Sequence, residues 1–365
     1  MSFDRRIFNF AAGPATLPEE VLKQAASEML NWQGLGCSVM EISHRSNEFM
    51  ALYEEIIADL RQLMQIPNHY AILFMQGGGI GQNAAIPMNL MALAKNSPKA
   101  DFLVTGIWSE KSQKEAAKYG EAHIVATYSK GGIASIPARN TWNLSTDAAY
   151  VHYCANETIS GVEFPDFPDV GSTPLVADIS SNIMARPIDV TRCGVLFAGA
   201  QKNIGPAGVT IVIVRHDLLG HAMPMTPMIW DWTNQAANQS MLNTPPTFAI
   251  YFSGLVFKWV KNQGGVLEME KRNLAKSSLL YNYIDQSSLY ENRVAKECRS
   301  KTNVTFYLKD EGLNAAFLEQ STKQGLVSLR GHKAVGGMRA SIYNAMPLAG
   351  VTTLVEFMRE FERRA

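Results

Sequence analysis

The sequence lacks the features that suit a membrane protein or a nucleic-acid-binding protein. None of its hydrophobic runs is long enough to span a bilayer, which takes about 20 apolar residues as a helix. Its 33 basic and 33 acidic residues leave no net charge, so the overall charge does not favour a nucleic acid or a membrane surface as partner. We therefore expect a small molecule as the partner.

The sequence also has few cysteines, and they lie far apart. They are Cys37, Cys154, Cys193 and Cys298. Because no two of them have CxxC spacing, the pattern argues against a zinc ribbon or a disulfide framework, and we expect no metal site. The first residues, with Asp4, Arg5 and Arg6 ahead of any apolar run, lack the apolar core of a signal peptide. Both observations favour a cytoplasmic protein.

The composition that remains is that of a globular protein with a large core. Hydrophobic residues make up 47% of the chain and charged residues 18%. The sequence contains no internal repeat and no low-complexity segment, which excludes solenoids and long disordered linkers. A chain of 365 residues fits one large and one small domain.

Strand and helix patterns alternate over the first two thirds of the chain. Short apolar runs predict buried strands at 71–75, 102–105, 150–153, 175–177, 195–198 and 209–214. Helical patterns at 83–94 and 111–119 separate some of these runs. This alternation is typical of an α/β fold with a mostly parallel, doubly wound sheet.

The last third of the chain has a different pattern. It predicts a long helix at 268–283, strands at 304–308, 327–329 and 340–343, and a closing helix at 352–363. These elements suggest a smaller α+β domain. We therefore predict a large α/β domain at 16–258 and a small domain made of residues 1–15 and 259–365.

Lys202 follows an apolar strand that ends in small residues, in the stretch FAGAQKN from Phe197 to Asn203. Small residues let a flat cofactor approach the backbone. A lysine at the end of a buried strand loses solvation, which lowers its pKa and suits it to form a Schiff base. The alternative is an ordinary lysine on a solvent-exposed loop, which is the commoner fate of this residue type.

Asp178 ends the apolar run LVAD, 24 positions before Lys202. This separation allows one crossover between neighbouring parallel strands, so both side chains could face one crevice. A carboxylate there would suit the protonated ring nitrogen of a pyridoxal cofactor, whose ring acts as the electron sink. The alternative is a helix N-cap, because Ser180 and Ser181 follow.

A glycine-rich loop, Gly77–Gln82 (GGGIGQ), lies between a predicted strand and a predicted helix. Free backbone amides and the helix dipole favour a phosphate at such a place. The same loop fits the dinucleotide pattern G-x-G-x-x-A, but that pattern normally needs an acidic residue at the end of the next strand. Here the next strand leads to Trp108, whose ring could stack on a flat cofactor or fill the core.

Five sequence blocks extend these features over the chain. They are SVMEISHRS, HYCANETISG, GAQKNIGPAG, NTPPTFAIYFSGLVFKWV from Asn243, and GGMRASIYNAMP. They resemble the phosphoserine aminotransferases, a class V, fold type I family that depends on pyridoxal 5'-phosphate, and the resemblance runs from Phe8 to Arg363. It implies a fold type I transferase with a mostly parallel sheet of the seven-stranded type.

The resemblance assigns cofactor roles to several residues. Lys202 would hold the cofactor as a Schiff base and shuttle the proton, and Asp178 would hold the pyridinium. The other implied cofactor residues are Gly79 and Ile80 at the phosphate, Gln201 assisting them, Trp108 on the ring, Thr158 near the ring hydroxyl, and Asn243 and Thr244 from a second subunit. The last pair implies a homodimer with shared active sites, although by itself it is an ordinary proline-braced turn.

For the substrate anions, the resemblance indicates a set of cationic side chains. Arg339 would bind the α-carboxylate, and the residues around the distal phosphate or carboxylate would be His44, Arg45, His332 and Lys333. A guanidinium pairs bidentately with a carboxylate, and clustered charges suit a phosphate dianion. His44 and Arg45 could otherwise be a solvated loop.

The sequence departs from the family pattern at three places. Ala12 stands where the family commonly has a substrate-binding serine, Ile80 where arginine or a small residue is expected, and Lys333 where arginine is frequent. Ala12 removes one hydroxyl contact, Ile80 should spare a backbone contact, and Lys333 replaces a fork of donors with a point charge. These departures therefore bear on substrate affinity more than on the type of reaction.

The implied reaction is amino transfer between L-glutamate and 3-phosphohydroxypyruvate, giving O-phospho-L-serine and 2-oxoglutarate in serine biosynthesis. Relatives in bacteria also form 4-phosphohydroxy-L-threonine in pyridoxine biosynthesis. One alternative is a fold type I aminotransferase for unphosphorylated serine or alanine. A second is a non-catalytic nucleotide-binding module built on the glycine loop.

Overall fold

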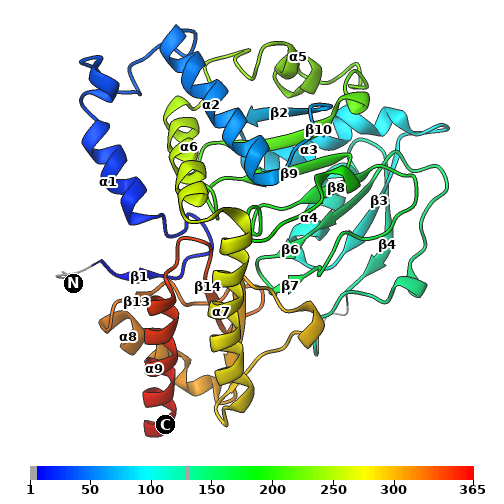
Figure 1. Ribbon diagram of the computed structural model, residues 1–365. Helices are drawn as coiled ribbons and strands as arrows, with labels where there is room; N and C mark the ends of the chain where they lie inside the picture. The colour runs from blue at the N-terminus through cyan, green and yellow to red at the C-terminus, as the bar shows by residue number, and fades with distance from the viewer. Residues whose placement is uncertain (1–5, 129–130) are drawn as a thin grey trace.

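The computed structural model describes residues 6–128 and 131–365, so the expectation that involved Asp4 and Arg5 lies outside the described residues. Figure 1 shows a larger part that contains the main sheet and a smaller part below it. The long helix α7 (Gly265–Gln286) runs from the larger part down into the smaller one. Within the described residues, no helix combines the length and apolar character needed to cross a membrane.

The main sheet has seven strands across the described residues, and all but one run parallel. In spatial order they are β2 (Tyr70–Met75), β10 (Thr210–Arg215), β9 (Val195–Gly199), β8 (Leu175–Asp178), β5 (Val151–Cys154), β3 (Lys99–Val104) and β4 (Glu121–Thr127). Only β10 is antiparallel to its neighbours. The prediction of a mostly parallel α/β sheet is confirmed, and all six predicted strands are present.

Side chains alternate between two hydrophobic cores, one on each face of the sheet. In β2, Ile72 and Phe74 pack into one core while Leu73 and Met75 pack into the other. The helices of the first face include α1 (Glu19–Glu28), α2 (Asn47–Met64) and α6 (Thr247–Asn262), and those of the second face include α3 (Gly78–Leu90), α4 (Ile107–Ala116) and α5 (Trp232–Ala237). This two-sided covering explains why most residues of the central parallel strands are apolar.

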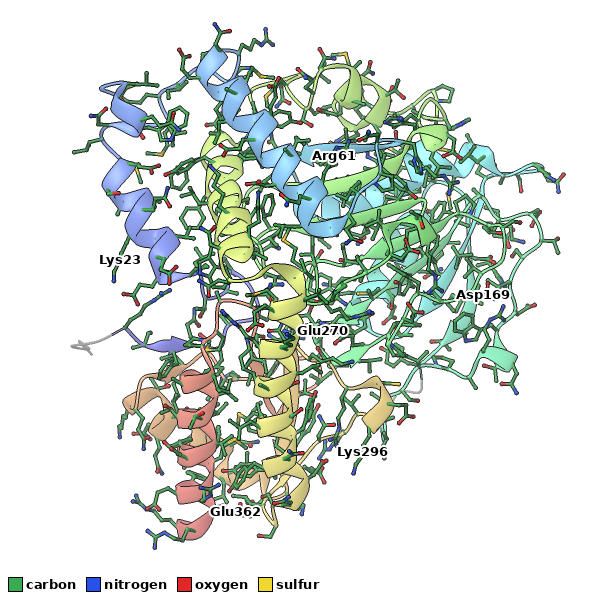
Figure 2. The ribbon with its side chains drawn as sticks, in the orientation of Figure 1. Lys23, Arg61, Asp169, Glu270, Lys296 and Glu362 are labelled. Carbon is green, nitrogen blue, oxygen red and sulfur yellow. The ribbon has the colours of Figure 1, made fainter. Side chains whose placement is uncertain are left out.

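The helices are held to the sheet by side chains that bond to exposed backbone groups. Arg61, in the last turn of α2, donates hydrogen bonds to the carbonyls of Pro67 and Tyr70 at 2.9 and 2.8 Å, where β2 begins (Figure 2). These bonds tie the end of α2 to the turn that leads into β2, where the Pro67 carbonyl also accepts a hydrogen bond from the Tyr70 amide. They fix the angle at which the chain enters the sheet.

The smaller part is built around α7 and a hydrophobic core of its own. Its elements are β1 (Phe8–Asn9), β11 (Tyr290–Glu291), β12 (Asn303–Leu308), α8 (Asn314–Lys323), β13 (Leu326–Val327), β14 (Met338–Ser341) and α9 (Leu348–Arg364). Glu362 on α9 accepts hydrogen bonds from Tyr283 and Ser287 at the end of α7, at 2.6 and 2.8 Å (Figure 2). This bond pair anchors the closing helix, which the sequence predicted at nearly the same place.

Candidate active site

The carboxyl ends of the parallel strands meet at one edge of the sheet, where α/β proteins generally bind their ligands. Strand β8 ends at Asp178, which pairs in register with Phe197 on the neighbouring strand β9. Strand β9 ends at Gly199, three residues before Lys202. The predicted crossover therefore brings Asp178 and Lys202 to the same crevice.

The Lys202 side chain points into this crevice. Its amine donates a 2.7 Å hydrogen bond to the Thr158 hydroxyl and lies 5.3 Å from the centre of the Trp108 ring. Burial lowers the pKa of the Lys202 amine, and the nearby Asp178 carboxylate partly opposes that shift. A lysine with a lowered pKa is more often uncharged, which is the state that attacks a carbonyl.

The Asp178 carboxylate makes the cap contact that the sequence presented as one alternative, and it does so with only one of its oxygens. One oxygen, Oδ1, accepts a 2.9 Å hydrogen bond from the Ser180 amide, as a cap would. The other, Oδ2, faces the start of α3, where a β-carbon placed on Gly79 would lie 4.0 Å from it. The local turn therefore holds the carboxylate without consuming both of its oxygens.

The glycine loop begins α3 directly above this carboxylate. Gly77 has a φ of 88°, which favours glycine, and a β-carbon there would lie 2.8 Å from the Trp230 ring. A β-carbon on Gly79 would instead meet Asp178 and Phe197 only at ordinary contact distances of 3.9 to 4.0 Å. The helix start therefore presents its amides close to Asp178, and the two fit a flat ring that carries both a cationic nitrogen and a phosphate.

The structure argues against the dinucleotide alternative. The nearest acidic residue on the next strand, Asp101, is fully buried within β3 rather than at its carboxyl end. Its carboxylate accepts hydrogen bonds from the amide and the hydroxyl of Ser145, both at 2.7 Å. It is therefore occupied elsewhere and does not present a carboxylate to a ribose beside the glycine loop.

Glu157 is one residue of this site that the sequence reading missed. Its buried carboxylate accepts hydrogen bonds from the amides of Trp108 and Ser109 at 3.0 and 2.9 Å, at the first turn of α4. A β-carbon on Gly106 would lie 2.5 Å from the Glu157 side chain, so glycine is required there. The pair fixes the helix that carries Trp108. In the sequence, the polar residues that follow the apolar strand in HYCANETISG could have indicated this role.

His152 is the second residue that the sequence reading missed. It is fully buried on β5, and its ring stacks on Phe102 with centroids 5.4 Å apart. Burial lowers the pKa of His152 to about 4, although the charge of Asp178 opposes that shift. The ring is therefore neutral at pH 7. A histidine within an apolar strand was the signal in the sequence.

Predicted substrate residues from the smaller part reach the same crevice. Arg339 on β14 donates a 3.1 Å hydrogen bond to the Thr158 carbonyl, while its buried Nε has no partner within the described residues. Partial burial and the charges of Arg339, Lys111 and Lys333 lower the pKa of His332. The crevice therefore has a cationic wall on the side of the smaller part.

Other predicted residues lie apart from the Lys202 amine within this chain. His44 and Arg45 are in the segment before α2, where the Arg45 guanidinium donates a 3.2 Å hydrogen bond to the His44 ring. Asn243 and Thr244 are exposed, and the Thr244 carbonyl accepts a 3.5 Å hydrogen bond from Gln76 beside the glycine loop.

Two further positions border the lysine segment. The Gln201 side chain folds back on Gly199, since a β-carbon there would lie 2.7 Å from the Gln201 Oε1. The carbonyl of Ala12, where the family commonly has serine, accepts a 2.8 Å hydrogen bond from the Tyr343 hydroxyl. Ala12 therefore joins the amino-terminal segment to the strand end that follows Arg339.

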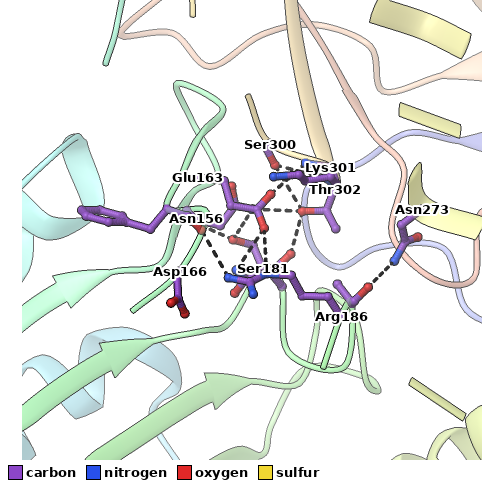
Figure 3. Close-up of polar contacts among 12 residues, drawn as sticks. Asn156, Glu163, Asp166, Ser181, Arg186, Asn273, Ser300, Lys301 and Thr302 are labelled. Carbon is purple, nitrogen blue, oxygen red and sulfur yellow. Dashed lines mark hydrogen bonds and ion pairs between the residues drawn. The ribbon is translucent and has the colours of Figure 1, made fainter. Parts of the chain in front are cut away.

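A buried polar network holds the smaller part against the strand ends (Figure 3). Asn156 donates hydrogen bonds to the hydroxyls of Ser181 and Thr302, both at 2.9 Å. Glu163 accepts a 2.8 Å hydrogen bond from the Lys301 amide. Because Asn156 lies just before Glu157 and Ser181 three residues after Asp178, this network sets the position of the smaller part relative to the crevice.

Comparisons with known proteins agree with the fold and with the chemistry of the crevice. The model of the aminotransferase class-V family matches residues 7–354. A phosphoserine aminotransferase from Paraburkholderia phymatum is 58% identical, covering 98% of this chain and 99% of that protein.

Solved structures give the same result. A phosphoserine aminotransferase studied for radiation damage of its Schiff base is 43% identical with a TM-score of 0.95, covering 99% of this chain and 100% of that one. The pyridoxal-phosphate-bound phosphoserine aminotransferase of Trichomonas vaginalis is 42% identical with a TM-score of 0.93, covering 97% of this chain and 100% of that one.

Proposed function

The chain belongs to the class-V aminotransferase family as a pyridoxal-phosphate-dependent transaminase, and we propose that it transfers the amino group of L-glutamate to 3-phosphohydroxypyruvate. The products are O-phospho-L-serine and 2-oxoglutarate. One contact pattern carries this proposal: Thr158 accepts a hydrogen bond from Lys202 through its hydroxyl and from Arg339 through its carbonyl. A single residue thereby links the reactive amine to the carboxylate-binding guanidinium.

The residues around Lys202 define how the reaction proceeds. Bound pyridoxal phosphate supplies a protonated ring that draws electrons from the α-carbon of the amino acid. The Lys202 amine, with its pKa lowered by burial, would accept the proton from that carbon and deliver it to the C4′ carbon of the cofactor. The Thr158 hydroxyl orients the amine, and the Trp108 ring forms one wall of the crevice. The Asp178 carboxylate would pair with the ring nitrogen of the cofactor.

Arg339 orients the amino acid for this proton transfer. Its guanidinium is partly buried, and burial lowers its pKa because the positive charge has lost part of its hydration. An anion bound beside the guanidinium would offset that loss. The Nη1 atom bonds to the Thr158 carbonyl and the buried Nε has no partner within the described residues, so the remaining N–H groups of the guanidinium can donate to a carboxylate. With the α-carboxylate at Arg339 and the α-amino group toward Lys202, the side chain of the substrate points to the remaining cations.

We predict that phosphoserine greatly outperforms serine as a substrate. Each charge-assisted hydrogen bond contributes about 1.5 to 3 kcal/mol, so two or three bonds to the phosphate separate it from a neutral side chain by several orders of magnitude. The measurement is kcat/KM for phosphoserine and serine with the wild-type enzyme. Equal values would leave only a general aminotransferase for unphosphorylated substrates.

Arg45→Ala extends the same experiment. The substitution should raise KM for phosphoserine and for glutamate, because the γ-carboxylate of glutamate occupies the same cationic end. Serine serves as the internal control, because its side chain is uncharged and does not depend on the charge of Arg45. A KM for phosphoserine that stays at the wild-type value would remove Arg45 from the substrate site.

We also propose a homodimer in which each active site includes residues from the other subunit. Ile80 at the start of α3 is 55% exposed, and Met228 nearby is 64% exposed. The segment that contains Met228 reaches the glycine loop through Trp230. Exposed apolar side chains gathered at a site mark a contact surface. Asn243 and Thr244 lie beside this surface, which supports the proposal that they serve the neighbouring subunit.

Mixed dimers test the shared sites. Lys202→Ala subunits and Thr244→Glu subunits are each expected to be inactive alone, the second because a carboxylate would repel the cofactor phosphate. A heterodimer of the two keeps one unaltered site of its two, so it should recover about half of the wild-type turnover. Heterodimers of Lys202→Ala subunits with subunits that carry both substitutions are the control. Recovery only in the control, or in neither, would contradict shared sites.

The cell compartment and a second substrate complete the proposal. All four cysteines are free thiols, which fits the reducing cytoplasm. The cationic set beyond Arg339 also fits the phosphorylated keto acid that yields 4-phosphohydroxy-L-threonine in pyridoxine synthesis, because that substrate carries the same phosphate and carboxylate groups. Assays with that keto acid as amino acceptor test this second activity.

A further inference from the structure

Lys111 lies at the crevice without an assigned role. It is on α4, one helical turn after Trp108, and its amine lies 4.5 Å from the centre of the Trp108 ring. The Lys202 amine lies 5.3 Å from the centre of the same ring. One aromatic side chain therefore contacts both the reactive amine and a second, exposed amine, and it links the two in space.

Lys111 also reaches toward the cationic wall of the smaller part. Its charge is one of three, with those of Arg339 and Lys333, that act on the His332 ring. Lys111 is therefore close enough to His332 for their charges to interact, although it belongs to α4 of the larger part. Four basic groups from two parts of the chain converge around one space.

Lys111 differs from the neighbouring lysines on α4 and just after it, because those lysines form ion pairs. Lys114 bonds to Glu110 at 2.8 Å and Lys118 to Glu115 at 2.7 Å, both as ordinary surface ion pairs. Within residues 6–128 and 131–365, Lys111 forms no ion pair with a carboxylate. Positive charges that are held close together without a counter-ion repel one another. An anion that binds among these basic groups is therefore attracted by each of them.

We infer that Lys111 binds the distal anionic group of the substrate, opposite His332, and contributes to the preference for a phosphate dianion over a carboxylate. The inference rests on the proposed function, because Arg339 must hold the α-carboxylate for the side chain of the substrate to reach Lys111. A compact ammonium on a flexible stem suits a phosphate, which accepts bonds in several directions. The Trp108 ring holds that stem at the mouth of the crevice.

Lys111→Met tests the inference, because methionine keeps an apolar chain over the Trp108 ring and removes the charge. The variant should lose roughly 10- to 100-fold in kcat/KM for phosphoserine, mostly through KM, and much less for alanine. Lys111→Arg, which restores a cation, should recover most of the loss. Lys114→Met, on the same helix, is the matched control and should leave both substrates at the wild-type values.

The outcomes separate this inference from the proposed function. If the wild-type enzyme does not prefer phosphoserine to alanine, the proposed function fails. If it does, and Lys111→Met keeps the same ratio of kcat/KM values, Lys111 has no part in binding the anion and the function stands. An equal loss for both substrates, with a lowered kcat, would also overturn the inference, because it would mean that Lys111 only positions Trp108.

Discussion

Replacing Lys202 with alanine is expected to abolish turnover, with a loss of at least about 10⁴-fold in kcat. The substitution removes the amine that holds the cofactor and also the group that moves the proton at the α-carbon. It leaves Thr158 and Trp108, which contact the amine, in place. The measurement is kcat for the conversion of phosphoserine and 2-oxoglutarate by purified protein.

Lys202→Arg is the matched control for this experiment. Arginine keeps the positive charge beside Asp178 but its guanidinium stays protonated and does not act as a nucleophile or a base. It should therefore be as inactive as Lys202→Ala. Substantial turnover in either variant would show that another group performs the proton transfer.

Asp178→Asn is expected to have the second largest effect. Asparagine keeps the shape and can still accept the hydrogen bond from the Ser180 amide, but it removes the charge that stabilises the protonated ring. We expect kcat to fall roughly 100- to 1000-fold, the range seen when one electrostatic contact to a developing charge is removed. Cofactor retention should change much less, because the amides at the start of α3 remain.

Asp169→Asn is the control that separates the charge from the turn. Asp169 is exposed and accepts a 3.0 Å hydrogen bond from the Gly171 amide, two residues on, as Asp178 does from Ser180. This variant should keep wild-type turnover. If Asp178→Asn also kept near-normal turnover while binding the cofactor, Asp178 would not be the partner of the ring nitrogen.

Much of the sheet could be predicted from the sequence because buried parallel strands are short apolar runs. The missed strand, β4, is at the edge of the sheet next to β3, and its side chains are mostly not buried, so its apolar signal is weak. Helix α6 was expected only as a helix after the proline-braced turn, without bounds, because it is buried on nearly all sides and has no strong polar face. The boundary at residue 258 stays a prediction; it falls inside α6, and Val260 and Val266 beyond it still belong to the core of the larger part.

The part of the candidate site that could be predicted consists of reactive side chains at the ends of apolar strands. Lys202 and Asp178 each end or follow an apolar run, and parallel strands bring such ends together. The contact between Arg339 and Thr158 joins residues 181 positions apart, and no local pattern indicates it. Glu157 was missed for the same reason, since its role depends on the close approach of Gly106, which only the folded chain makes visible.

The most direct test of the account is to identify the lysine that holds the cofactor. Lys276 is the informative rival, because it is buried and burial lowers its pKa to about 7, yet its amine already donates hydrogen bonds to the carbonyls of Ile342, Tyr343 and Met346. Borohydride reduction of the purified enzyme, followed by peptide mapping, locates the fixed cofactor. The account predicts the label on Lys202 alone, and a label on Lys276 or on any other lysine would contradict it.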